Sequence, residues 1–150
     1  MAPMTDDLTM TLTRLFDATP TQIWAAWTDP EILPRWFGPK GYSCTTKEID
    51  LRSGGVWRFD MIGPDGTAWP NRHRITRYTP MTGIAFLLDD DTDAYAAMEV
   101  VVTLTPEGAG VRLTQTITFP NAEAKAGALA FGAAELGETT LDKLAAILAG

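Results

Sequence analysis

The stretch GGVWRFDMIGPDGTAWPNRH, residues 54–73, has the pattern of a complete β-hairpin. Before the turn, Trp57, Phe59 and Met61 alternate with polar residues, which is the period of a half-buried strand. The turn itself, Pro64-Asp65-Gly66, is typical of a three-residue hairpin loop that ends on a left-handed glycine. The sequence therefore predicts two antiparallel strands joined directly, with one aromatic face that must be buried.

The turn also fixes which residues lie opposite one another, since antiparallel partners keep a constant sum of residue numbers. The predicted pairs are Gly63 with Thr67, Met61 with Trp69, Phe59 with Asn71, and Trp57 with His73. The inward face then carries Asn71 and His73 among its aromatic residues, and continued alternation adds Arg77. An unpartnered polar group in a dry core costs about 1–3 kcal/mol. This face therefore predicts one wall of a wet or ligand-filled space, unless the polar groups satisfy one another or a loop carbonyl.

Two short helices are predicted before this hairpin. Thr19 is suited to cap the first helix, with Pro20 at its first position and Gln22 completing a capping box. Asp29, followed by proline, repeats the start signal, so a second short helix is predicted to run to about Trp36.

The rest of the chain up to residue 119 is predicted to form strands. Alternation begins at Leu8, and the later strands are expected at about 42–50, 54–63, 67–79, 83–89, 95–105 and 110–119. Their short connections imply antiparallel neighbours. In the last strand, Gln115 lies in the middle of apolar inward positions, as Asn71 and His73 do in the hairpin.

The last thirty residues are alanine-rich and predict one long terminal helix, with leucines at helical spacing near its end. Gly127, Gly132 and Gly137 fall inside it, and each costs about 1 kcal/mol relative to alanine. Two interpretations stay open. A helix with little side-chain bulk leaves a pocket against a curved sheet, or its small residues allow a close approach that removes the pocket.

Composition excludes several classes of function. The chain has 12 Lys and Arg against 19 Asp and Glu, a net charge of −7, so electrostatic repulsion disfavours nucleic acid and anionic membranes as partners. Cys44 is the single cysteine, which excludes an internal disulfide and cysteine-cluster zinc sites. The stretch MAPMTDDLTM, residues 1–10, has no basic region followed by an apolar stretch, so we expect no signal peptide, and no apolar run is long enough to predict a membrane span. We expect one cytoplasmic domain over residues 8–150, a flexible N-terminus at 1–7, and no metal or cofactor.

Three blocks carry a resemblance to a known family: FDATPTQIWAAWTDPEILPRWFGP, DLRSGGVWRFDMIGPDG and TTLDKLAAIL. They resemble the START-like (SRPBCC, helix-grip) superfamily, in the branch similar to the C-terminal domain of the activator of heat-shock protein 90 ATPase. The resemblance implies an α+β fold, with a seven-stranded antiparallel sheet curved around a long C-terminal helix and two short helices between the first two strands. It also implies a cavity that binds hydrophobic molecules in some members, and a co-chaperone role in the stress response in others.

Two departures from the family pattern bear on the site. His73 and Arg77 stand where many relatives have a small residue and a glutamate, which predicts a more basic pocket here. Gly137 stands where relatives often carry a bulky aromatic residue, which predicts a wider pocket or a closer partner.

Three functions follow as hypotheses. The first is binding of a hydrophobic or amphipathic small molecule between sheet and terminal helix. Its predicted site residues are Trp57, Phe59, Met61, Trp69, Asn71, His73, Arg77, Gln115, Phe131 and Glu135. The second is an interaction module for a chaperone ATPase. Under each hypothesis the protein is expected to be a monomer or a homodimer. The third is an enzyme of the cyclase or hydratase kind, with His73 as general base and Arg77 or Asn71 stabilising an enolate.

Overall fold

The computed structural model describes residues 8–94 and 96–150, so the predicted flexible N-terminus, residues 1–7, lies outside the described residues. Seven strands form one antiparallel sheet in the order β1-β7-β6-β5-β4-β3-β2. The elements are β1 Thr9–Phe16, α1 Pro20–Thr28, α2 Leu33–Trp36, β2 Ser43–Ile49, β3 Val56–Ile62, β4 Ala68–Thr79, β5 Gly83–Asp89, β6 Met98–Glu107, β7 Gly110–Thr118, α3 Ala122–Phe131 and α4 Ala133–Ala149. The predicted α+β helix-grip architecture is confirmed.

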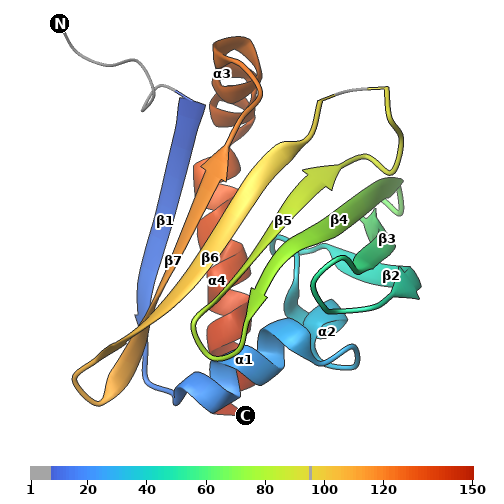
Figure 1. The fold of residues 1–150 in the computed structure, drawn as a ribbon. Helices are drawn as coiled ribbons and strands as arrows, with labels where there is room; N and C mark the ends of the chain where they lie inside the picture. Colours follow the sequence, from blue (N-terminus) through green and yellow to red (C-terminus); the bar gives the residue numbers. More distant parts are fainter. Residues whose placement is uncertain (1–7, 95) are drawn as a thin grey trace, which may run out of the picture.

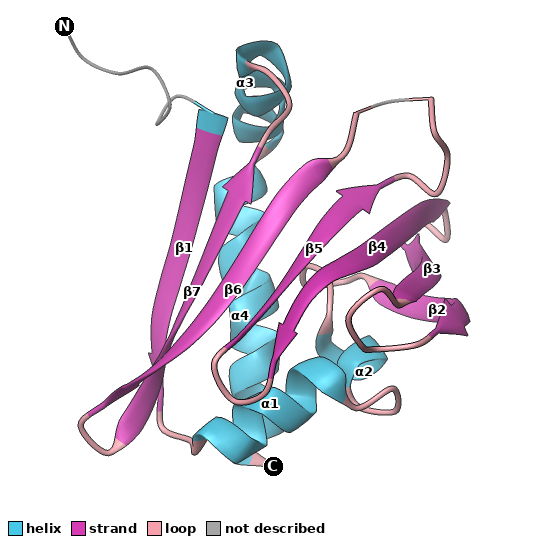
Figure 2. Ribbon diagram, in the orientation of Figure 1, coloured by secondary structure: helices cyan, strands magenta, loops and turns pink. Residues whose placement is uncertain are grey.

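All the helices of the described residues that pack on the sheet lie on one of its faces (Figure 1). Helix α4 runs across that face, and α1 and α2 close it at the end where the chain terminates, while α3 stands at the opposite end (Figures 1 and 2). Contacts of α4 with β1, α1 and α2 hold this arrangement together. In the part of the chain that the structure describes, no helix is both long and apolar enough to cross a membrane.

The hairpin register is as predicted. Met61 lies opposite Trp69, and the other predicted pairs of β3 and β4 are also present. Gly66 closes the turn at φ +86°, where a side chain would be strained. Pairing of β4 with β5 begins only at Arg72, so β4 extends past the end of its neighbour. Pro70 lies in this overhang, where the missing N–H removes no bond to β5.

Helix α1 begins as its sequence indicates. Gln22 N–H donates to the Thr19 hydroxyl at 3.2 Å, and the Gln22 side chain accepts from the Thr19 N–H at 2.8 Å. Helix α2 starts later than predicted, at Leu33. The Asp29 carbonyl accepts from the N–H groups of Ile32 and Leu33, so the chain makes a turn before the helix starts.

The single long terminal helix was predicted wrongly, because the chain forms two helices divided at Gly132. This residue has φ +95°, a left-handed conformation that ends α3 and precedes α4. The two interpretations of the helix glycines then apply to different helices. A Cβ on Gly137 in α4 would overlap Cδ1 of Leu12, whereas a Cβ on Gly127 in α3 would meet no atom of the described residues within 4 Å outside the backbone of its own helix. Helix α4 approaches the sheet closely and α3 stands away from it.

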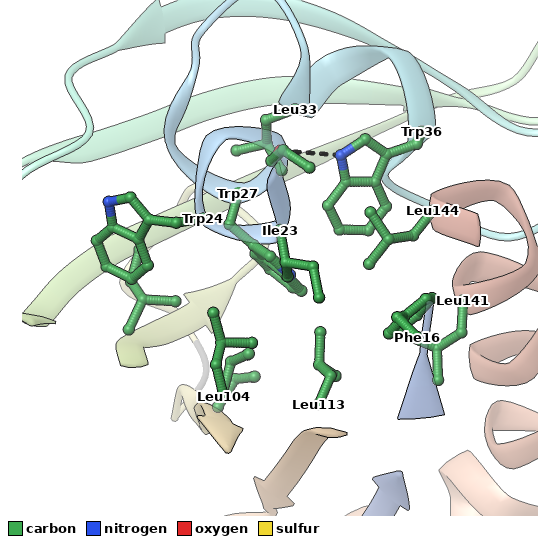
Figure 3. Close-up of a cluster of buried hydrophobic side chains, with 14 of the residues drawn as sticks. Phe16, Ile23, Trp24, Trp27, Leu33, Trp36, Leu104, Leu113, Leu141 and Leu144 are labelled. Atoms are coloured by element: carbon green, nitrogen blue, oxygen red, sulfur yellow. Dashed lines mark hydrogen bonds between the residues drawn. The ribbon is translucent and has the colours of Figure 1, made fainter. Parts of the chain in front are cut away.

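The main core fills the space between α1, α2, α4 and the sheet (Figure 3). Its residues include Phe16, Ile23, Trp24, Trp27, Leu33, Trp36, Leu104, Leu113, Leu141 and Leu144. Trp36 is only 1% exposed, and its Nε1 donates to the Ala26 carbonyl at 2.9 Å (Figure 3). This core fixes the end of the sheet that α1 and α2 cover.

Candidate functional site

Three of the predicted site residues form a filled aromatic cluster. Trp57 and Phe59 are fully buried, and their rings stack at 3.7 Å between centroids. His73 stacks on Phe86 at 4.1 Å, and Phe37 meets the rings of Trp57, Phe59 and His73 edge-on. These rings pack directly against one another and fill the space between them. This end of the inward face is therefore core and not the expected ligand cavity.

His73 is held as a neutral side chain. Its Nε2 has no hydrogen-bond partner among the residues that the structure describes, and burial lowers the pKa of the imidazole to about 3 against a weaker opposing effect of Asp89. Only 4% of the residue is exposed. A general base must reach its substrate proton, directly or through a water. The aromatic rings around His73 leave no such route in this arrangement, so the geometry gives the His73-based enzyme no support.

The prediction that Arg77 faces inward is wrong. The pairing of β4 with β5 shifts between Ile75 and Arg77, which indicates a bulge at this point. The extra residue reverses the alternation, so Ile75 is buried, Arg77 is exposed, and Tyr78 packs inward against Trp24. Arg77 therefore borders a hollow on the opposite face of the sheet, and the expected trio of Asn71, His73 and Arg77 does not assemble.

Two apolar clefts lie at the other end of the inward face, next to α3. We name the first the loop cleft, because it borders the segment after β5; it measures 440 Å³ and is lined by Trp69, Pro70, Asn71, Leu88, Asp89, Asp90, Ala96, Met98, Pro120 and Ala124. The second, the helix cleft, measures 380 Å³ and is lined by Pro39, Tyr42, Met61, Trp69, Phe131 and Leu136. Trp69 belongs to both clefts and is 56% exposed.

The remaining predicted residues divide between these clefts and their surroundings. Met61, Trp69, Asn71 and Phe131 line one or both clefts. Asn71 also donates from Nδ2 to the carbonyl of Trp69 at 2.9 Å, so one N–H of its amide is satisfied locally. Two others line neither cleft: Gln115 is half-buried on β7 between its neighbours Leu12 and Val102, and Glu135 is exposed at the start of α4.

The far wall of the helix cleft is held by α4. Lys143 donates from Nζ to the carbonyls of Pro39 and Tyr42, at 3.3 and 3.0 Å. The Lys40 N–H donates to the Thr139 hydroxyl at 3.0 Å. Burial lowers the pKa of Lys143, although the nearby Cys44 opposes this effect. These bonds fix residues 39–42 before any ligand arrives, which reduces the entropy cost of binding.

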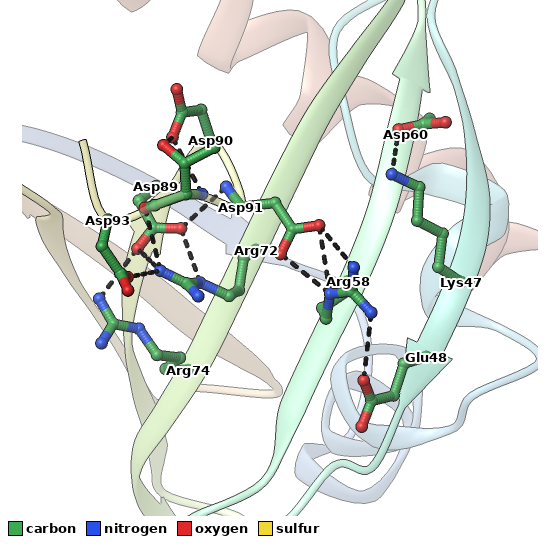
Figure 4. A network of polar contacts seen from close by, with 11 residues as sticks. Lys47, Glu48, Arg58, Asp60, Arg72, Arg74, Asp89, Asp90, Asp91 and Asp93 are labelled. Carbon is green, nitrogen blue, oxygen red and sulfur yellow. Dashed lines mark hydrogen bonds and ion pairs between the residues drawn. The ribbon is translucent and has the colours of Figure 1, made fainter. Parts of the chain in front are cut away.

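The segment beside the loop cleft is held by charge pairs on the outer face of the sheet (Figure 4). Arg72 binds both carboxylate oxygens of Asp89, at 2.9 and 2.7 Å, and Arg74 binds one of them at 2.9 Å. Arg58 makes a similar pair with Asp91. Burial alone would raise the pKa of Asp89, but the hydrogen bonds and charges of the arginines lower it below its usual value. Three arginines therefore form ion pairs with the carboxylates of this segment.

Sequence reasoning missed much of the cleft lining. Leu88 and Met98 lie opposite one another and continue the row that begins at Trp57 and His73, so extending the alternation to β5 and β6 would have found them. Tyr42 and Leu136 carried no such signal, because their positions depend on how residues 39–42 dock on α4. Within residues 8–94 and 96–150, no three His, Cys, Asp or Glu side chains gather in a way that could hold a metal ion.

Comparisons with known proteins agree with this architecture. Residues 17–149 match the family described as activator of Hsp90 ATPase homolog 1-like protein. The chain is similar to a crystal structure of a Mycobacterium smegmatis protein, with 31% identity, a TM-score of 0.84, and coverage of 96% of this chain and 92% of that one. A Nitrosomonas europaea protein has 26% identity, a TM-score of 0.86 and coverage of 95% and 94%.

The AHSA1 protein of Silicibacter pomeroyi is also similar, with 26% identity, a TM-score of 0.76, and coverage of 94% of this chain and 97% of that one. Among curated proteins, no match is found.

Proposed function

The chain belongs to the family of activator of Hsp90 ATPase homolog 1-like proteins, and from that premise we propose that it binds a hydrophobic small molecule in the loop cleft and the helix cleft. The observation that carries the proposal is Trp69. This indole lies on the inward face of the sheet, yet 56% of it is exposed, and it separates two apolar clefts. A ligand that covers it would remove a large apolar surface from water.

The dimensions of the site support the same function. Each cleft lies within the range of about 300–1,000 Å³ that is usual for small-molecule sites. The linings are mostly apolar, with a few polar groups gathered in the loop cleft, as is common in such sites. Phe131 is 75% exposed at the rim of the helix cleft, so a bound ligand would also cover this ring.

The proposal is tested with Nile red, an uncharged apolar dye whose emission rises in apolar surroundings. We expect saturable binding that Trp69→Ala weakens about tenfold, the effect of losing one well-packed aromatic contact. Leu15→Ala is the matched control, because Leu15 is also a large exposed apolar residue, at 48%, but lines a different hollow. Equal losses in the two variants, or no saturable binding, would contradict the proposal.

A second candidate function is contact with a chaperone ATPase, which the description of the family favours. Helix α3 has no buried residue and exposes Leu129 and Phe131 to solvent, so it offers an apolar surface for a protein partner. The test is the ATPase rate of an Hsp90-type chaperone with and without this protein. Stimulation that Phe131→Ser abolishes would support this function, whereas an unchanged rate would remove it.

A further inference from the structure

We infer that the ligand is a cationic amphiphile, with its apolar body in the helix cleft and a protonated amine or quaternary ammonium head in the loop cleft, between Trp69 and Asp90. This inference rests on the binding function proposed above, and adds the chemical class and the orientation of the ligand. It differs from the expectation of a basic pocket, which the linings of the two clefts do not bear out.

The two clefts differ in polarity, and this difference orients the ligand. The helix cleft is lined by aliphatic and aromatic residues alone, apart from the Tyr42 hydroxyl. The loop cleft contains Asn71, Asp89 and Asp90. A molecule with one apolar and one polar end therefore matches the pair of clefts in a single direction, because a polar head in the helix cleft would lose its hydration without gaining partners.

The sign of the head follows from the two carboxylates. Asp89 is already neutralised, since Arg72 and Arg74 both bind it. Asp90 accepts from the N–H and hydroxyl of Thr92, at 3.2 and 2.6 Å, but it forms no ion pair with any described residue. Figure 4 shows it apart from the three arginines. One uncompensated negative charge therefore lies at the loop cleft, in a protein whose net charge is −7.

Positive side chains do not compete for this position. Arg77 lies on the opposite face of the sheet, and among the described residues no basic side chain lines either cleft. On α3, Glu123 and Lys125 flank Ala124 with opposite charges. Lys143 donates to two carbonyls of residues 39–42, which border the helix cleft, and Lys40 belongs to these residues. The positive charges of Lys143 and Lys40 therefore disfavour a cationic head in the helix cleft and favour one in the loop cleft.

Trp69 supplies the second partner for a cation. Tryptophan has the strongest attraction for cations among the aromatic residues, because the face of its ring is negative. A head placed between the indole and Asp90 gains this attraction together with the opposite charge. Aromatic rings are a known means of recognising quaternary ammonium groups.

The test uses three octyl probes below their micelle concentrations at low salt: octyltrimethylammonium, octyl glucoside and octanoate. By isothermal titration calorimetry, we expect octyltrimethylammonium to bind about tenfold more tightly than octanoate, with octyl glucoside between them. Asp90→Asn should weaken octyltrimethylammonium about fivefold and leave octyl glucoside unchanged.

Asp93→Asn is the matched control, because it removes the same charge from the same segment. Asp93 is 91% exposed and pairs with Arg72, so its loss should change the affinity for octyltrimethylammonium less than about twofold.

The outcomes separate the inference from the function on which it rests. Binding of octyl glucoside that Trp69→Ala weakens, without a preference for the cation, overturns the inference alone. Equal effects of Asp90→Asn and Asp93→Asn also overturn it, because they would show a general field of the protein instead of a site. If no probe binds in a way that depends on Trp69, the proposed function itself is wrong.

Discussion

Trp57 and Trp69 lie on the same face of the same hairpin, yet the first is fully buried and the second is 56% exposed. Around Trp57 the inward face is covered by Phe37, which follows α2, and Trp57 packs there beside Phe59 and His73 of the same sheet. Around Trp69 it is bordered by two clefts and by Phe131, at the end of α3. Both ends of the hairpin place a tryptophan on the inward face, so the elements that cover the face determine which end becomes core.

The two coverings differ in bulk and in distance from the sheet. Helices α1 and α2 bring Trp24, Trp27 and Trp36 into the core, and α4 approaches the sheet so closely that a Cβ on Gly137 would overlap Leu12. Helix α3 consists largely of alanine and has no buried residue. In addition, β4 extends past the end of β5. Alternating aromatic residues in a strand therefore predict which face of the sheet is turned inward. A ligand site on that face also requires that the element covering it leaves part of the space unfilled.

The largest expected difference between the two ends of the face is in their contribution to stability. Phe59→Ala at the filled end should lower the free energy of unfolding by about 3–5 kcal/mol, because the buried ring leaves a cavity. Trp69→Ala removes a larger side chain but should cost less than about 1 kcal/mol, since much of the indole is already in water. Urea unfolding of both variants measures the difference. Similar losses would mean that the end at Trp69 is also core.

A smaller effect is expected from pH, and it tests whether the filled end is dry. His73 is the only histidine, and its pKa of about 3 in the folded protein lies below the value of about 6.5 expected in the unfolded chain. The unfolded state therefore binds more protons as pH falls, and stability is lost below pH 6.5. Between pH 7 and pH 5 we expect a loss of about 2 kcal/mol.

His73→Phe provides the control for this pH dependence, because it keeps a ring and removes the titrating group. Asp89 and Asp91 also have lowered pKa values, and they too destabilise the fold as pH falls, but mainly below pH 5. The loss between pH 7 and pH 5 should therefore disappear in the variant. If the variant keeps the same loss, His73 is protonated in the folded protein and water reaches the filled end.

Local signals in the sequence were sufficient for most of the fold. The capping box at Thr19 and the turn ending at Gly66 each satisfy backbone groups within a few residues. The start of α1 and the register of β3 with β4 could therefore be predicted from the sequence alone. The inward row of β3 followed from this register. Met61 and Trp69 were thereby placed correctly on the face that now borders the clefts.

The errors arose where one residue changes a long-range pattern. The bulge before Arg77 reverses the alternation of β4, and no local signal distinguishes it from regular strand. Gly132 takes the left-handed conformation that separates α3 from α4, whereas Gly127 and Gly137 remain helical. All three are glycines within the same alanine-rich segment, so composition could not indicate which of them divides it.

The smallest predicted effect compares the two helices through these glycines. Gly127→Ala should stabilise the protein by about 0.5–1 kcal/mol, because alanine favours the helix and its methyl group meets no other atom. Gly137→Ala should lack this gain, since its methyl group must displace Leu12 on β1. Thermal unfolding measures the stability of both variants. When Leu12 is already alanine, Gly137→Ala should stabilise the protein relative to the Leu12→Ala single variant. Equal stabilisation at both positions would mean that α4 yields as readily as α3, so that close packing of α4 could not explain why only one end of the face stays open.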